Sequence, residues 1–118
     1  MVSIEKRIAV IYLAWLPYGI DHFKSFVDSY NSHPSGCKHE LIIAFNGIKL
    51  NSGNNPEDYL DYLSRFTNLP YRVLYFDSGQ DIAIYTEISK LLDHDFLFFL
   101  NTYSILLCDS WLALFVNN

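Results

Sequence analysis

The stretch Ile8-Ala-Val-Ile-Tyr-Leu-Ala-Trp15 decides the fold class of this chain of 118 residues. It is a continuous apolar run with β-branched members, which is typical of a strand buried on both faces, as in a parallel sheet. Lys6 and Arg7 precede the run, and Pro17 and Gly19 punctuate its end. We therefore predict a buried strand over residues 8–15.

Outward from this strand, three more apolar segments are predicted as strands: residues 39–45, 71–76 and 96–100. Between them the apolar residues recur at helical spacing, which predicts helices over residues 20–30, 56–66, 82–92 and 111–116. Strands that alternate with helices form a parallel sheet with helices on both faces. We therefore predict one α/β domain over residues 1–118, a three-layer α/β/α Rossmann-like fold with a mostly parallel sheet of about four strands.

Three of the helix starts carry more detailed predictions. Asn55-Pro56 offers an N-cap acceptor and a proline at the first helical position. Asp81 is predicted to cap the third helix, and Asp109 or Ser110 the last one. The buried stripe of the third helix is predicted to consist of Ile82, Tyr85, Ile88, Leu91 and Leu92.

The composition excludes several classes of protein. Hydrophobic residues make up 51% and charged residues 18% of the chain, which is too apolar for a disordered protein. The formal net charge of −5 argues against a nucleic-acid binder that relies on counterion release. The sequence has no run of about 18 apolar residues, so no transmembrane helix is predicted. Cys37 and Cys108 fit no zinc or disulfide pattern, and two unpaired thiols indicate a cytoplasmic protein.

Open α/β sheets bind ligands at the carboxyl ends of their strands, where the strand order switches. This rule selects the segments that follow the predicted strands, at residues 14–19, 46–53, 77–81 and 101–104. Their polar residues are candidates for a binding site: Asn46, Asp77, Ser78, Gln80, Asp81, Asn101, Thr102, Tyr103 and Ser104. Each of them alone is also explained as a turn former or a helix cap. Trp15, Tyr18 and Tyr103 are either stacking partners for a nucleobase or sugar, or packing residues.

Several familiar site motifs are absent. The sequence has no GxxxxGK[ST] loop, no GxGxxG after the first strand and no GxSxG elbow. A receiver domain has a similar size and topology, but the first strand here ends in Ala14-Trp15-Leu16, where that domain needs an acidic pair. These absences exclude the commonest nucleotide and ester chemistries.

A resemblance to one enzyme family runs along nearly the whole chain. The clearest segments are Asp77-Ser-Gly-Gln-Asp-Ile-Ala-Ile-Tyr85 and Asp95-Phe-Leu-Phe-Phe-Leu-Asn-Thr-Tyr-Ser104, and residues 13–19, 26–36, 39–47 and 109–112 extend them. Together they resemble the nucleotide-binding half of family-2-like glycosyltransferases with the type A fold. The resemblance implies that a nucleoside-diphosphate sugar is held over the strand ends and that its sugar passes to an acceptor hydroxyl.

The resemblance also implies roles for particular residues. Asp81 would lie near the nucleotide, and Asn101 with Ser104 near the diphosphate and the sugar. Asn46 and Asp77 are weaker candidates for the same site. Tyr85, one helical turn after Asp81, either shares the site or packs on the sheet, and no catalytic residue is assigned.

A divalent cation, Mg²⁺ or Mn²⁺, commonly neutralises the leaving diphosphate in such enzymes. The Asp-x-Asp that usually holds it is absent here, and Asn101-Thr102-Tyr103 stands in its place. Neutral ligands bind these hard cations poorly, so the chain departs from the family at the expected metal site.

The segment Trp111-Leu-Ala-Leu-Phe-Val116 is apolar almost all round, and such a helix needs cover on more than one side. We expect the chain to span only the nucleotide-binding half of a type A domain. A partner chain or a second copy would then cover this segment, unless it tucks under the sheet. Two hypotheses remain: a glycosyltransferase-like protein of polysaccharide or cell-envelope glycan assembly, and a non-catalytic α/β module that self-associates through residues 111–116.

Overall fold

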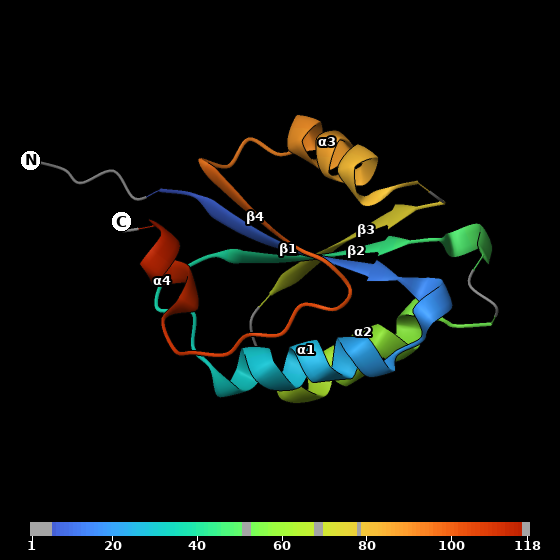
Figure 1. Ribbon diagram of the computed structural model, residues 1–118, viewed down its shortest axis with the longest axis horizontal. Helices are drawn as coiled ribbons and strands as arrows, with labels where there is room; N and C mark the ends of the chain where they lie inside the picture. Colours follow the sequence, from blue (N-terminus) through green and yellow to red (C-terminus); the bar gives the residue numbers. More distant parts are fainter. Residues whose placement is uncertain (1–5, 51–52, 68–69, 78, 117–118) are drawn as a thin grey trace, which may run out of the picture.

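The computed structural model describes residues 6–50, 53–67, 70–77 and 79–116. Four strands form one sheet in the order β3-β2-β1-β4, and all neighbouring strands are parallel. Figure 1 shows these strands crossing the molecule: β1 (Ile8–Trp15), β2 (Glu40–Asn46), β3 (Tyr71–Phe76) and β4 (Phe96–Leu100). The predicted α/β fold with a four-stranded parallel sheet is confirmed.

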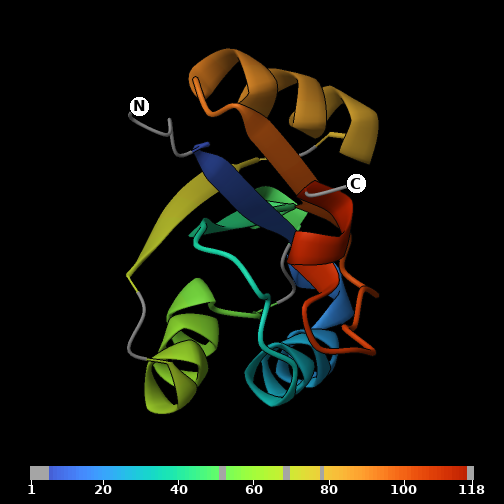
Figure 2. The same ribbon diagram turned by 90° about the vertical axis from the view of Figure 1, so that its left-hand side faces the viewer.

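Helices cover both faces of the sheet, so the fold has three layers. The helices α1 (Asp21–Ser32) and α2 (Pro56–Phe66) lie on one face, and α3 (Asp81–Leu91) lies on the other (Figures 1 and 2). The short helix α4 (Trp111–Val116) packs against β4, where the rings of Trp111 and Phe98 lie 5.7 Å apart. This arrangement is the Rossmann-like one that the alternation of strands and helices predicts.

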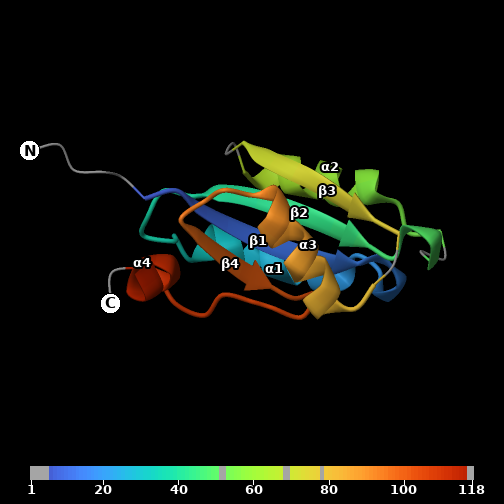
Figure 3. The same cartoon turned by 90° about the horizontal axis from the view of Figure 1, so that it is seen from above.

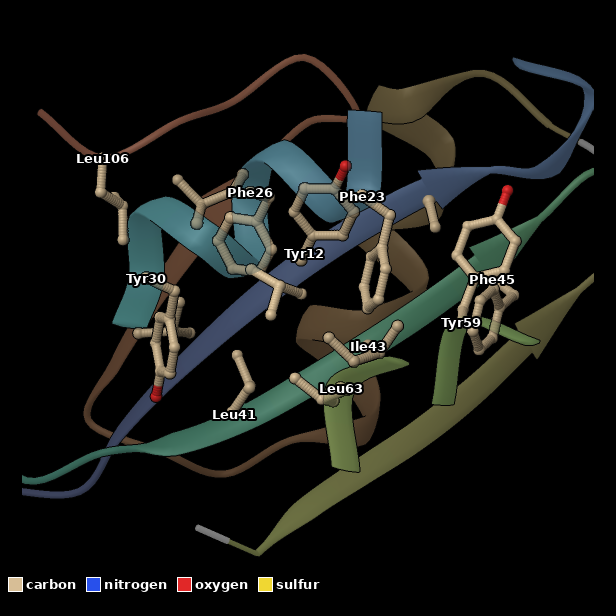
Figure 4. Packing of buried hydrophobic residues seen from close by; sticks show 14 of the residues in the cluster. Tyr12, Phe23, Phe26, Tyr30, Leu41, Ile43, Phe45, Tyr59, Leu63 and Leu106 are labelled. Atoms are coloured by element: carbon tan, nitrogen blue, oxygen red, sulfur yellow. The ribbon is translucent and has the colours of Figure 1, made fainter. Parts of the chain in front are cut away.

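The side chains of β1 divide between two hydrophobic clusters. Val10 and Tyr12 belong to the cluster under α1 and α2, and Ile11 and Leu13 belong to the cluster under α3. All four side chains are buried, because helices cover both faces of this strand. The first cluster is rich in aromatic rings, and Figure 4 shows Tyr12 beside Phe26, with the stacked ring centroids 4.2 Å apart.

The strand order creates a switch point between β1 and β4. The chain runs outward from β1 to β2 and β3, then crosses to the other side of β1, where β4 pairs from Ile8↔Phe96 to Tyr12↔Leu100. All four strands run from left to right in Figures 1 and 3. Their carboxyl ends therefore share one edge of the sheet, called the carboxyl edge below, and their amino ends share the opposite, amino edge.

The predicted buried face of α3 is correct for Ile88, and for Tyr85 and Leu92, which are partly buried, but wrong for Ile82 and Leu91. The buried residues of this helix are Ile84 and Ile88, whereas Ile82 and Leu91 are exposed. Apolar side chains occupy most of the circumference of α3, so the sequence offers more than one apolar stripe. Packing against the sheet buries Ile84 and Ile88, an i, i+4 pair whose side chains lie on the same side of the helix.

The cap predicted for α2 is confirmed, and the cap predicted for α3 is wrong. Asn55 Oδ1 accepts a hydrogen bond from the backbone N–H of Glu57 at 3.0 Å, as an N-cap does. At α3 the N-cap is Gln80, which makes no side-chain cap bond, and Asp81 is the first helical residue. The acidic side chain thus lies in the first turn, where the helix dipole favours it. The segment after β2, predicted as a loop, contains a short 3-10 helix, η2 (Ile48–Leu50).

The helix α4 is capped by a loop that is distant in sequence. The Ser35 carbonyl accepts hydrogen bonds from the backbone N–H groups of residues 112–113, both at 3.1 Å. Of the two predicted caps, Asp109 bonds instead to His33 Nδ1 at 3.0 Å, and Ser110 adopts a left-handed φ of 60°. No local sequence pattern predicts this cap, because the accepting carbonyl belongs to the turn between α1 and β2.

Candidate functional site

The chain after β4 is fixed against the end of β1 at the switch point. Thr102 Oγ1 donates a hydrogen bond to the Leu13 carbonyl and accepts one from the Trp15 N–H, both at 2.9 Å. The Tyr12 hydroxyl donates to the Thr102 carbonyl at 2.6 Å. These bonds continue the contact between the two strands beyond the last paired residues, Tyr12 and Leu100. The loop that follows β4 therefore has a defined position at the carboxyl edge.

Four aromatic rings gather at this switch point: Trp15, Tyr18, His22 and Tyr103. We call them the switch-point aromatics. The centroids of Tyr18 and Tyr103 lie 5.3 Å apart, those of His22 and Tyr103 4.6 Å, and those of Trp15 and Tyr18 6.4 Å. Tyr18 is 51% and Tyr103 is 56% exposed, so these two rings offer faces to a ligand. His22 was not expected here, although its position four residues after Tyr18, across a helix start, is a signal for it.

Close packing supports the aromatic group from below. Gly47 has a φ of +80°, and a Cβ atom on it would lie 2.8 Å from the Trp15 ring and 2.9 Å from Pro17. Asn54 Nδ2 donates to the Leu16 carbonyl at 2.8 Å and so holds η1 (Leu16–Tyr18). A glycine is thus required where the turn after β2 meets the turn after β1.

Asn101 and Ser104, two of the predicted site residues, form a tight turn beside the aromatic group. Asn101 Oδ1 accepts hydrogen bonds from the Tyr103 N–H at 3.0 Å and from Ser104 Oγ at 3.1 Å. Ser104 Oγ in turn accepts from the Asn101 N–H at 3.0 Å. The serine hydroxyl is therefore used within the turn. Asn101 is exposed, and its Nδ2 makes no hydrogen bond to the described residues, so it has donors left.

Asn46 and Asp77 have partners within the protein. Asn46 is fully buried; its Nδ2 donates to the Gly79 carbonyl and its Oδ1 accepts from the Gly47 N–H, both at 2.9 Å. It joins the end of β2 to the turn after β3. Asp77 is exposed and forms an ion pair with Lys49 at 3.4 Å. Ser78, named among the candidates above, lies outside the described residues.

Asp81 and Tyr85 differ in their surroundings. Asp81 opens α3 at the carboxyl edge, is exposed, and makes no hydrogen bond to the described residues. The Tyr85 ring lies 4.4 Å from the Phe99 ring. Burial, with the Asp81 charge adding to it, raises the pKa of Tyr85. Tyr85 therefore packs on the sheet, and Asp81 is the exposed polar group of the pair.

The implied Mg²⁺ or Mn²⁺ does not fit the acids at this edge. Within the described residues, no three His, Cys, Asp or Glu side chains gather in a way that would hold a metal ion. Asp77 is paired with Lys49. Among the described residues, no helix is long and apolar enough to cross a membrane.

No family model matches the chain, and no match is found among curated proteins or among solved structures. The likeness to glycosyltransferases therefore rests on the sequence segments quoted above. A function for the carboxyl edge is therefore inferred from the side chains that lie there. These side chains offer exposed aromatic faces, a free amide donor on Asn101 and a free carboxylate on Asp81.

Proposed function

We propose that the chain binds a nucleoside-diphosphate sugar at the carboxyl edge, between β1 and β4, as the donor site of a glycosyltransferase-like protein. The switch-point aromatics carry the proposal. Open α/β sheets bind ligands at this point, and the chain exposes two tyrosine rings there. Aromatic side chains whose faces are open to water are stacking partners for nucleobases and for the apolar faces of sugars.

Tyr18 and Tyr103 are suited to stacking because their neighbours limit their motion. Each ring contacts the other and also His22. Interaction with the Tyr18 side chain raises the pKa of Tyr103. A tyrosine with its ordinary pKa near 10 is already uncharged at neutral pH, so the phenol of Tyr103 does not repel an anionic ligand. Rings that are already positioned lose less conformational entropy when a base stacks on them.

Two polar side chains complete the proposed site. The Asn101 amide has N–H donors left for a diphosphate oxygen, and Asp81 has carboxylate oxygens left for a ribose hydroxyl. Ser104 supports the Asn101 turn rather than the ligand. Asn46, Asp77 and Tyr85 have roles inside the protein, so we no longer place them at the ligand.

The proposed reaction is a displacement at the anomeric carbon. The acceptor hydroxyl oxygen bonds to that carbon while the bond from the carbon to the diphosphate oxygen breaks. The diphosphate leaves with the electron pair, and the acceptor proton passes to a base that we do not assign to a described residue. The thiols of Cys37 and Cys108 are free, which supports our placement of the protein in the cytoplasm.

A thermal-shift panel tests the binding step. The chain is heated with nucleoside diphosphates and their sugars, each with and without Mg²⁺ or Mn²⁺. A ligand at 100 times its dissociation constant adds about 2.7 kcal/mol to the free energy of unfolding, which raises the melting temperature clearly. The base that gives the largest rise identifies the donor, and the comparison with and without cation shows whether a metal takes part. A flat panel on folded protein would refute the proposal.

Tyr103→Ala and Tyr75→Ala form a matched pair for locating the ligand. Both tyrosines are exposed and both contact a neighbouring aromatic ring, but Tyr75 lies on β3, away from the switch point. We expect Tyr103→Ala to weaken nucleotide binding by about tenfold, since stacking contributes roughly 1–3 kcal/mol per base. Tyr75→Ala should leave the dissociation constant unchanged. Equal effects of the two changes would place the ligand elsewhere.

A second candidate function is self-association, favoured by the surface around α4. Trp111 and Leu112 are buried under the sheet, as one interpretation of this segment expects. Leu114 and Phe115 are exposed, and the Phe115 ring lies 5.1 Å from that of Phe98 on β4. An apolar surface beside an edge strand is a usual site of contact between protein chains.

A further inference from the structure

We propose that the amino edge of the sheet carries a second binding site, for a small organic anion with phosphate groups. A pocket of about 600 Å³ opens there, lined by residues 6–8, 38–40, 70–72 and 94. The amino ends of β1, β2 and β3 contribute to its wall, at the left of Figures 1 and 3, together with His94 shortly before β4. Its volume lies in the range of small-molecule sites, roughly 300–1,000 Å³.

The charge of this pocket is opposite to that of the whole chain. Its wall contains Lys6, Arg7, Lys38 and Arg72, which are half of the eight lysines and arginines in a chain of net charge −5. Among the described residues of the wall, Glu40 is the only acidic one. Cations that line a concave site concentrate the field there and attract anions. A chain with a net negative charge thus places half of its lysines and arginines around one hollow.

Two of these cations are not neutralised by acids. Lys38 is exposed and makes no ion pair or hydrogen bond with the described residues. The Lys6 ammonium lies over the Phe96 ring, 5.2 Å from its centroid, and so keeps its charge. Arg7 differs, because its Nη1 is paired with Asp93 at 2.9 Å. Lys38 and Lys6 are therefore the groups that a ligand phosphate would neutralise first.

Arg72 is positioned within the wall by Glu40. Its Nη2 lies 2.5 Å from Glu40 Oε1, an ion pair without hydrogen-bond geometry. A guanidinium has five N–H donors, so donors remain for a ligand and suit the bidentate binding of a phosphate. Glu40 thus holds the Arg72 side chain in place and leaves N–H donors of the guanidinium available for a ligand.

Some buried polar atoms of the pocket wall have no hydrogen-bond partner among the described residues. The His94 side chain is only 4% exposed, and its Nδ1 is buried without a hydrogen-bond partner among the described residues. Its Nε2 lies 3.9 Å from Glu40 Oε1, which is beyond hydrogen-bond length. Most buried polar atoms in proteins have a partner, so an unpaired imidazole in a pocket wall is a mark of an incomplete site.

The shape and the lining favour a small phosphate ester over a macromolecule. The pocket is concave, and Ile8, Pro70 and Tyr71 give part of its wall an apolar or aromatic surface for the organic part of a ligand. Nucleic acid is disfavoured by the net charge of −5. The site lies at the opposite end of the strands from the proposed donor site, so it does not depend on that proposal.

An NMR titration of the full ¹⁵N-labelled chain tests the site. The probes are inorganic pyrophosphate and glucose 6-phosphate, at low ionic strength. We expect amide shifts at residues 6–8, 38–40, 71–72 and 94 without shifts at residues 101–104, and weaker binding when salt screens the charges. Shifts confined to the carboxyl edge, or no shifts at millimolar probe, would overturn the proposal. Pyrophosphate binding without any preference for glucose 6-phosphate would still support the phosphate site.

Lys38→Gln and Lys90→Gln provide the matched comparison. Both lysines are exposed and both changes remove one positive charge, but Lys90 lies on α3, outside the pocket. We expect Lys38→Gln to weaken pyrophosphate binding by about tenfold and Lys90→Gln to leave it within about twofold. Equal losses in both variants would show general charge attraction and overturn the site. Tighter binding of a hexaglutamate peptide than of either phosphate probe would also overturn it, in favour of an acidic protein partner.

Discussion

Thr102 joins the end of β4 to the end of β1 through a single hydroxyl. The hydroxyl donates to the Leu13 carbonyl and accepts from the Trp15 N–H, and the residue is buried. Valine has nearly the same shape but no hydroxyl. Thr102→Val therefore leaves two buried backbone groups unpaired, which we expect to lower the free energy of unfolding by about 2 kcal/mol. Urea unfolding measures this loss.

Thr86→Val is the control for this change. Thr86 Oγ1 also donates to a backbone carbonyl, that of Ile82, but the bond is exposed on α3. Water replaces that bond when the hydroxyl is removed, so we expect a change within about 0.5 kcal/mol. If both valine variants unfolded at the same urea concentration, the switch point would not depend on the Thr102 hydroxyl.

Tyr59 makes the stability sensitive to alkaline pH. Burial, with the Asp21 charge adding to it, raises the pKa of Tyr59 to about 12, whereas tyrosine in an unfolded chain ionises near 10. The folded state then holds the proton more tightly, so this contribution is complete below about pH 10 and is lost as the pH rises to about 12. Its hydroxyl has no hydrogen-bond partner in the part of the chain that the structure describes. We expect Tyr59→Phe to unfold like the parent at pH 7 and to lose less stability between about pH 10 and 12.

Tyr12→Phe separates this effect from a lost hydrogen bond. The Tyr12 hydroxyl donates to the Thr102 carbonyl at 2.6 Å, so its removal should already cost about 1 kcal/mol at pH 7. Chemical unfolding at pH 7 and at alkaline pH distinguishes the two variants. An unchanged alkaline slope in Tyr59→Phe would contradict the assignment.

At the scale of the elements, two helix starts with different caps allow a direct comparison. Asn55 bonds the Glu57 N–H at the start of α2, whereas Gln80 makes no cap bond at the start of α3. We expect Asn55→Ala to destabilise the protein by about 1 kcal/mol and Gln80→Ala to change stability by less than about 0.3 kcal/mol. Thermal unfolding of both variants checks the difference. A larger loss in Gln80→Ala would mean that α3 has a cap of another kind.

The sequence predicts elements well where apolar runs and punctuation agree. The residues of β1, β3, β4 and α4 coincide with the predicted ones, because Pro, Gly, Asn or Asp residues flank each run. The buried face of α3 was mispredicted in part: Ile82 and Ile84 both begin an apolar stripe, and only packing against the sheet shows that Ile84 is the buried one. The cap of α4 was missed because the Ser35 carbonyl reaches it from 77 to 78 positions away. The local sequence pattern predicts where a helix or strand lies along the chain. Which of its faces is buried depends on tertiary contacts.

At the scale of the whole molecule, the two candidate sites differ in how visible they are in the sequence. The carboxyl edge follows from the strand order rule, which selected Tyr18, Asn101 and Tyr103 in advance, although their hydrogen bonds inside the turn were not foreseen. The amino edge was missed, because Lys6, Lys38 and Arg72 look like isolated charges. A signal exists all the same: each stands at or just before the start of a strand, and parallel strands bring such positions together.

β4 is one of the two edge strands of the sheet in the described chain, with β3 the other, and the five residues of β4 carry no charge. Phe115, 68% exposed, lies beside it. Uncharged edge strands pair readily with other strands. Two copies related by a two-fold axis could pair β4 with β4 and cover both Phe115 rings, since such an interface uses the same surface on each copy. We therefore expect concentration-dependent dimers in sedimentation experiments.

Replacing Leu114 and Phe115 together by Lys should shift this equilibrium to monomer, because a dimer would have to bury four added charges. Leu112 is unsuitable for the test, since it is fully buried and its replacement would damage the core. Leu91→Lys is the control, because Leu91 is an equally exposed leucine on α3, across the sheet from α4. A parent chain that sediments as a monomer at every concentration would remove the basis for self-association. Dissociation by Leu91→Lys alone would move the contact to the α3 face.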